Sequence, residues 1–348
     1  MDRPAPQQDV DGIMAAMPAY STEFAETFAN HAPMVLVALD RIGGGADRLH
    51  DFFRSYEAYK VLLPVQPGTA PLTAADLPAL LGAREREDDL RRYFAAEVDR
   101  LGWREALAVH LPGLASGVGA SALHALMRTA YGILREDPQE IAIALAYWHW
   151  SHLALPPATG AAPVTADPAE VLARAGRIDA LRALPLHGLL WQNMAESGRC
   201  AGFAPVVDWL EIGPDTLDRM AAASIALFAA TQDFSALHAV TGCHWLRIVL
   251  PCCSADTQET MLRSFWQCIA ALSGEMGFPA LPSAARLERW RMAEAPDWPA
   301  IFAAARLSDD EHDISVAFSA SEEDRIRPDP LYRVSVARRL GLIRDYRT

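Results

Sequence analysis

The segment DFSALHAVTGCHWLRIVL, residues 233–250, decides the fold class because its apolar residues recur at helical spacing. Along it, steps of four, three, four and three residues join Phe234, His238, Thr241, Trp245 and Ile248. This spacing places the five side chains on one stripe of an α-helix. A stripe of this kind packs against a core, so His238 and Thr241 are expected to point inward.

The same spacing continues through most of the chain, and period-two alternation with turn dipeptides is hard to find. The sequence therefore predicts an all-α fold, with helices that begin near Ser21, Asp47, Arg84, Val118, Pro138, Asp215, Phe234, Ala255 and Ser283. The Pro- and Gly-rich break at residues 155–164 could separate two lobes, but the composition does not shift across it. We expect a poorly ordered tail over residues 1–20 and one large helical domain, with a buried histidine-rich pocket, over residues 21–348.

Composition limits the partners. The formal charge of −13 argues against a nucleic-acid-binding surface, which would concentrate Lys and Arg. The sequence has no apolar run of the ~18 residues that a membrane span needs, no signal peptide at its start and no CxxC pair among its five cysteines. These features predict a soluble cytoplasmic protein with no nucleic-acid or membrane partner. The oligomeric state stays open, with a homodimer as one candidate.

A charge run, REREDDLRR, covers residues 84–92. Both signs of charge recur there at helical spacing, which predicts a solvated helix face.

Three more histidines are expected on inward helical faces. In FAETFANHAPMVLVAL, residues 24–39, His31 shares a stripe with Phe24 and Phe28. In GVGASALHALMRTAYGIL, residues 117–134, His124 shares one with Tyr131, and in LSDDEHDISVAF, residues 307–318, His312 shares a helical side with Ser315.

A buried neutral imidazole needs partners for both ring nitrogens. One such histidine is most often a hydrogen-bonded core residue, but four on inward faces favour a metal, because helical proteins build metal sites from facing helices. The candidate ligands are therefore His31, His124, His238 and His312. Imidazole suits Fe, Zn, Cu and Ni, and Asp310 or Glu311 is available to balance the charge.

Other residues are candidates for the surroundings of this site. Tyr131 and Thr241 lie on the same inward faces and are candidate substrate-facing residues. His149 and His152, in YWHWSHL, are three apart on one expected helical face. They are a weaker candidate metal pair and, among neighbouring aromatic residues, candidate walls of a substrate pocket.

Five segments resemble the questin oxidase family, in the order in which that family has them. They are FANHAPMVLVALDRIGG, LPGLASGVGASALHALMRTAYG, IALAYWHWSHL, ALHAVTGCHWLRIVLP and DDEHDISVAF, and they span about residues 24 to 320. The resemblance implies an all-helical oxidoreductase that inserts oxygen into, or cleaves a ring of, anthraquinone-like aromatic polyketides. Family members are described both as NADPH-using Baeyer-Villiger-type oxidases and as non-haem iron oxygenases that use O2. The four histidines favour iron, because no flavin or Rossmann motif is found.

This chain departs from the family pattern at Ser315. The family usually has a lysine three residues after the acidic histidine motif, and that lysine, if carboxylated, could supply an anionic ligand beside the histidine. Serine cannot replace it directly. Three outcomes stay open: Asp310, Glu311 or another carboxylate substitutes, an exogenous anion or water fills the gap, or the metal is weakly bound and the chemistry differs. The leading hypothesis is a metal-dependent oxygenase. Its rivals are a metal-free NADPH-dependent oxidase and a non-catalytic protein that binds an aromatic ligand.

Overall fold

The structure, a computed structural model, describes residues 7–344 of the 348-residue chain. The described residues form 17 α-helices and no strand beyond isolated bridges such as Tyr20 with Pro64. The predicted all-α fold is confirmed. Of the predicted tail, residues 1–6 lie outside the described part, and helix α1 (Gln7–Met14) follows directly.

The helices group into two compact units, and the first contains both ends of the chain. Unit 1 consists of residues 1–67 and 288–348, and unit 2 of residues 68–287. The break at residues 155–164 therefore lies inside unit 2 and separates no units. The prediction of one domain over residues 21–348 stays a prediction.

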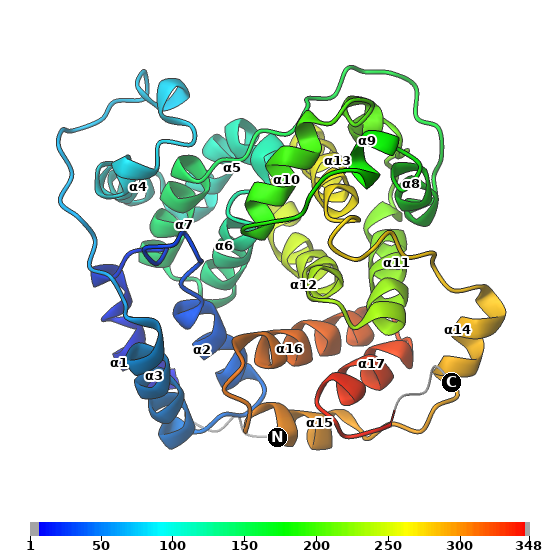
Figure 1. Ribbon diagram of the computed structural model, residues 1–348. Helices are drawn as coiled ribbons and strands as arrows, with labels where there is room; N and C mark the ends of the chain where they lie inside the picture. The colour runs from blue at the N-terminus through cyan, green and yellow to red at the C-terminus, as the bar shows by residue number, and fades with distance from the viewer. Residues whose placement is uncertain (1–6, 345–348) are drawn as a thin grey trace. The chain divides into compact units, whose positions relative to one another are not determined.

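In unit 1, helix α16 packs against α2, α15 and α17 (Figure 1). The helices there, apart from α1, are α2 (Ala32–Arg41), α3 (Ala46–Lys60), α15 (Trp298–Ala305), α16 (Glu311–Ile326) and α17 (Leu331–Arg339). Helix α14 (Ala284–Arg291) crosses the boundary between the units.

Unit 2 is built around two buried helices, α7 and α12. Every residue of α7 from Glu140 to Trp150 is buried, because α4, α5 and α6 pack around it. Helix α12 packs between α6 and α11. The helices of unit 2 are α4 (Glu87–Leu101), α5 (Trp103–Leu114), α6 (His124–Arg135), α7 (Pro138–Trp150), α8 (Pro168–Ala175), α9 (Asp179–Arg182), α10 (Leu190–Arg199), α11 (Thr216–Thr231), α12 (Phe234–Val249) and α13 (Ala255–Ala271).

Side-chain caps explain why several predicted helix starts are confirmed. Asp137 accepts hydrogen bonds from the second and third amides of α7, while Pro138 occupies the first position, where no hydrogen-bond donor is needed. Asp233 caps α12 and Ser254 caps α13 in the same way. The starts at Pro138, Phe234 and Ala255 were therefore predictable from local chemistry.

The predicted helix from Ser21 is wrong. Residues 21–31 form an irregular segment in which Glu23 bridges to Ala29 and Thr27 adopts a left-handed φ of 63°. Helix α2 begins only at Ala32, because Pro33 lacks an amide hydrogen and its ring clashes with a preceding turn, so it fits the first turn and no other place in a helix. The stripe that joined His31 to Phe28 does not exist, and Phe28 is exposed.

The predicted start near Val118 is also wrong. Ser121, Ala122 and Leu123 have φ of 47°, 56° and 74°, so a left-handed turn separates the preceding segment from α6, which begins at His124. Each non-glycine residue in this region costs roughly 1–2 kcal/mol, and side chains of these types give no warning of it. The turn places His124 at the N-terminus of its helix.

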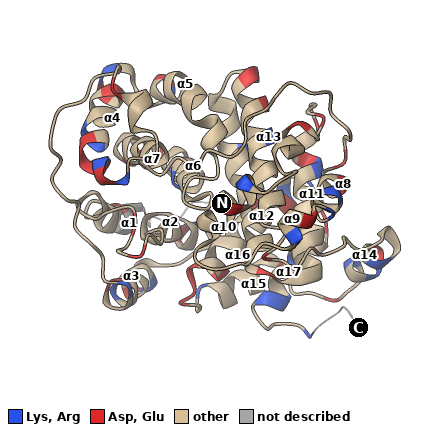
Figure 2. Cartoon of the chain, turned by 45° about the horizontal axis from the view of Figure 1, so that its top comes forward, with Lys and Arg blue, Asp and Glu red and all other residues tan. Residues whose placement is uncertain are grey.

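The charge run at residues 84–92 is only partly solvated. Figure 2 shows charged residues of both signs along α4, but Asp89 is 2% exposed and Arg91 is also buried. The Asp89 carboxylate accepts hydrogen bonds from the Arg86 and Arg92 side chains and from the backbone amides of Thr69 and Ala70. The run therefore fastens the preceding loop to α4, which corrects the prediction of a solvated face.

We expect Asp89→Asn to lower the free energy of unfolding by about 2.5 kcal/mol at pH 7. Burial raises the pKa of Asp89, but hydrogen bonds led by that from Arg86 outweigh it and lower the pKa to about 2. Because the folded pKa lies below the unfolded value of about 4, this stabilisation is present above about pH 4 and is lost as the pH falls towards 2. Urea unfolding at pH 7 and pH 3 measures the difference. An equal loss of unfolding free energy at pH 7 and pH 3 would contradict the explanation. The substitution Asp51→Asn, at an exposed residue, is the control.

Candidate metal centre

The four candidate histidines form two pairs, one in each unit. In unit 1, the ring centroids of His31 and His312 lie 5.1 Å apart, with an interplanar angle of 67°. His31 occupies the position directly before α2, without a capping hydrogen bond from its side chain, and His312 is the second residue of α16. In unit 2, the rings of His124 on α6 and His238 on α12 lie 5.6 Å apart. His31, His124 and His238 are buried and His312 is partly buried.

All four imidazoles are oriented in the same way, because each Nδ1 faces an oxygen atom that accepts a hydrogen bond. The acceptors are the backbone carbonyls of Ala29 for His31 (2.8 Å), Ser121 for His124 (2.5 Å) and Phe234 for His238 (2.8 Å), and the Asp310 carboxylate for His312 (3.0 Å). Since these oxygens carry no hydrogen to donate, each Nδ1 carries a proton, and in a neutral ring the lone pair is then on Nε2. Metal-binding histidines have this arrangement, in which a hydrogen bond at one nitrogen fixes the ring for coordination through the other.

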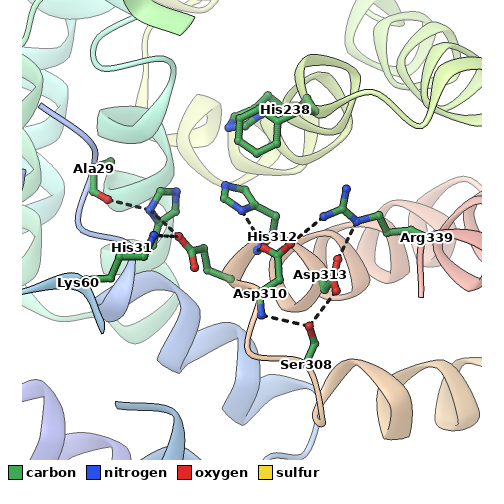
Figure 3. A network of polar contacts seen from close by, with 11 residues as sticks. Ala29, His31, Lys60, His238, Ser308, Asp310, His312, Asp313 and Arg339 are labelled. Carbon is green, nitrogen blue, oxygen red and sulfur yellow. Dashed lines mark hydrogen bonds and ion pairs between the residues drawn. The ribbon is translucent and has the colours of Figure 1, made fainter. Parts of the chain in front are cut away.

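Asp310 orients His312 and is itself held in place (Figure 3). One carboxylate oxygen accepts hydrogen bonds from the backbone amide and Nδ1 of His312, and the other accepts one from Arg339 at 2.9 Å. Arg339 also binds Asp313, whose carboxylate accepts a bond from Ser308. The hydrogen bond from the His312 ring is the main cause that holds the pKa of Asp310 well below its usual range.

Glu311 is the second acid beside the pair in unit 1, and it faces different partners. Its Oε1 lies 3.9 Å from His31 Nδ1 and 3.2 Å from Lys60 Nζ, and the residue is buried. One oxygen or nitrogen atom from each of Asp310, Glu311 and His312 lies within 4.8 Å of the others. Of the two acids that the sequence offers, Asp310 therefore orients a histidine, and Glu311 is placed to balance the charge beside His31.

The position at which the family resemblance led us to expect a lysine holds a buried serine. Ser315 lies in α16, one turn after His312, and is 3% exposed. Its hydroxyl has no hydrogen-bond partner among the described residues. The donor set thus contains imidazoles and a nearby carboxylate, which fit iron or zinc, without an anionic group at position 315.

Tyr131 and Thr241 lie in the helices that carry the second pair. Both are buried, Tyr131 in α6 and Thr241 in α12. The Thr241 hydroxyl donates to the carbonyl of Leu237 at 3.2 Å, one turn earlier in its own helix. Their roles towards a substrate stay predictions.

His149 and His152 do not share a helical face. Helix α7 ends at Trp150, so His149 is helical and His152 lies beyond the helix, which corrects the predicted spacing. Burial, followed by the nearby His152, lowers the pKa of His149 to about 4. His149 lines a pocket of about 300 Å³ in unit 2 with Phe94 and His110.

Lys60 is the residue at this site that sequence reasoning missed. Composition could have drawn attention to it, because Lys60 is the only lysine among 31 Lys and Arg residues and the other 30 are arginines. Its ammonium contacts the Glu311 carboxylate, which lies beside His31.

No described helix has the length and apolar character needed to cross a membrane.

Comparison with known proteins agrees with these motifs. A search of curated proteins gives no match. The family model described as questin oxidase-like matches residues 28–317, which include all four histidines. That name indicates an oxidase, an oxidoreductase, that acts on a polyketide-type substrate. Since the match covers most of the 348 residues, the chain belongs to the questin oxidase-like family.

Proposed function

We propose that this protein is a metal-dependent oxygenase that uses non-haem iron and O2 to insert oxygen into, or cleave a ring of, an aromatic polyketide or anthraquinone-like substrate. The observation that carries the proposal is the common orientation of the four imidazoles, each with its proton held on Nδ1 and its lone pair on Nε2. A core histidine needs a hydrogen bond, but nothing requires four of them to present the same nitrogen. Ligation through Nε2 would explain it, because a metal-binding histidine usually donates the N–H of its other ring nitrogen to an oxygen atom.

In this proposal His31, His124, His238 and His312 are the metal ligands. Iron, when bound, would supply the binding and activation of O2. Three backbone carbonyls and Asp310 fix the directions of the rings, and Glu311 would offset part of the positive charge of a metal held by neutral ligands. Tyr131, Thr241, His149 and His152 are proposed to face or shape the space for the substrate. The proposal includes a cytoplasmic protein whose partner is a small aromatic molecule.

Metal removal tests the proposal. We expect protein purified without chelator to contain iron and to consume O2 in the presence of an aromatic substrate. Treatment with a strong chelator should abolish oxygen uptake, and Fe(II) should restore it, because the residues that would hold the metal carry no redox chemistry of their own. Metal analysis and an oxygen electrode provide the measurements.

Two other outcomes would point to the rival functions. Oxygen uptake that requires NADPH and survives chelation would identify a metal-free oxidase and contradict the iron proposal. Tight ligand binding without turnover, with or without iron, would identify a binding protein. The buried serine at position 315, where the resemblance led us to expect a lysine, is the observation that favours this second rival.

A further inference from the structure

A pocket of about 530 Å³ lies within unit 1, on the surface between α3 and residues 309–312. Its volume is in the range of small-molecule sites, roughly 300–1,000 Å³. Phe52, Tyr56, Tyr59 and Lys60 line it from α3, and their spacing of four, three and one residues puts them on one side of the helix. Aromatic surface and one ammonium group therefore face the same space.

Each carboxylate around the pocket is paired with a positively charged side chain, whereas the Lys60 ammonium uses only part of its hydrogen-bonding capacity. Asp309 pairs with Arg48 at 3.0 Å, and Asp310 pairs with Arg339 at 2.9 Å. Lys60 faces Glu311 at 3.2 Å, but an ammonium has three N–H donors and this contact uses one. The Lys60 side chain is 30% exposed, so its other donors are accessible to a ligand.

Aromatic rings flank the same ammonium. Lys60 Nζ lies 6.0 Å from the ring centroid of Tyr56 and 5.4 Å from that of Tyr59. Tyr56 is fixed, because its hydroxyl accepts the backbone N–H of His31 at 2.9 Å. Tyr59 is 81% exposed and is therefore able to stack on a flat ligand.

The composition of the chain distinguishes the Lys60 ammonium in this pocket from the other positive charges. The chain uses arginine at each of its 30 other basic positions. Arginine presents a broad planar fork, whereas lysine presents a compact charge that approaches a single oxygen atom. The single oxygen atom of a phenolate is a ligand group that suits this compact charge.

We propose that Lys60 is a substrate-contacting residue of this pocket, where its ammonium binds the phenolate oxygen of a hydroxylated aromatic ligand stacked on Tyr59. The phenol releases its proton to solvent, and the ammonium keeps its charge. The inference rests on the proposed function only for the aromatic nature of the substrate. The other ionisable groups that face the pocket are Tyr56, Tyr59, Asp309, Asp310, Glu311 and His312. The carboxylates among them oppose a phenolate, so its stabilisation depends on Lys60.

Binding of two matched probes tests the proposal without turnover. 2-Hydroxyanthraquinone changes its visible absorption when it ionises, and 2-methoxyanthraquinone cannot ionise. We expect the bound hydroxy probe to ionise at lower pH than the free probe. Lys60→Met should remove this shift and weaken binding of the hydroxy probe at least about tenfold, with little effect on the methoxy probe. Lys60→Arg should retain part of the shift.

Two further variants separate the ammonium from the aromatic wall. Tyr59→Ala changes an exposed residue and should weaken both probes alike. Arg54→Met, on the same helix and paired with exposed Asp51, should change neither. An unshifted or raised ionisation pH in the wild-type complex would overturn the proposal, as would failure of the hydroxy probe to bind.

Acetylation of amines provides a test that needs no variant. Because Lys60 is the only lysine, an acetylating reagent modifies Lys60 and the N-terminal amine, which serves as an internal control. The hydroxy probe should slow acetylation of Lys60 several-fold and leave the N-terminal amine unaffected, as measured by peptide mass spectrometry. Equal rates with and without the probe would contradict the contact. A protein without iron or oxygen uptake would refute the proposed function and leave these measurements intact.

Discussion

Replacing His124 with alanine should remove the bound metal from the purified protein and abolish oxygen uptake. Loss of a residue that merely orients a ligand costs about 10–100-fold in metal affinity or activity, and loss of a ligand should cost more. His124 is the first residue of α6, and its ring contacts a local carbonyl and the neighbouring His238, so the truncation should leave the rest of the helix in place. Metal content per chain and circular dichroism together measure the result.

A second substitution tests whether the two pairs serve the same ion. If all four histidines bind one metal, His31→Ala should remove the bound metal from the protein as completely as His124→Ala does. If each pair binds an ion by itself, each variant should keep the metal of the other pair, and the shared site would be refuted. His50→Ala is the matched control, because His50 is exposed on α3.

Arg128→Met should lower the free energy of unfolding by about 3–5 kcal/mol. Arg128 in α6 and Glu140 in α7 are 1% and 4% exposed, and two hydrogen bonds of 3.0 and 3.1 Å join them. Methionine fills much of the arginine volume but leaves the Glu140 carboxylate buried without its main partner. Urea denaturation at neutral pH measures the loss.

The double variant Arg128→Met/Glu140→Gln separates the charge from the packing. It should recover a large part of the stability, because it removes the uncompensated carboxylate. A double variant no more stable than Arg128→Met would show that packing, rather than the ion pair, holds α6 to α7. The exposed pair of Arg325 with Glu322 is the control, and Arg325→Met should cost less than about 1 kcal/mol.

The fold was predictable where the chemistry is local. Asp137, Asp233 and Ser254 cap their helices through side chains that the sequence displays, so the starts of α7, α12 and α13 could be found. Pro33 also lies in the first turn of its helix, but the apolar spacing of the residues before it resembles that of a continuing helix. The left-handed turn at residues 121–123 could not be found, because Ser, Ala and Leu adopt it only under tertiary constraint.

The candidate site was predicted in part. All four histidines were expected inside, and the structure brings them together as two pairs. The reason given for His31 was wrong, since it lies directly before a helix instead of on a helical stripe. Asp310 orients His312, and Glu311 lies beside His31. These different positions depend on the distant partners Arg339 and Lys60, which no local sequence pattern reveals.

The four Nδ1 hydrogen bonds span only two to four residues along the chain. Contacts of such short sequence separation close in well under a millisecond, whereas packing between distant segments forms later. Three of these hydrogen bonds can therefore form before the distant chain segments are in place, whereas that of His124 also needs the left-handed turn at residues 121–123. The histidines are thus oriented by their own helix starts, and their alignment does not require a metal to organise the chain.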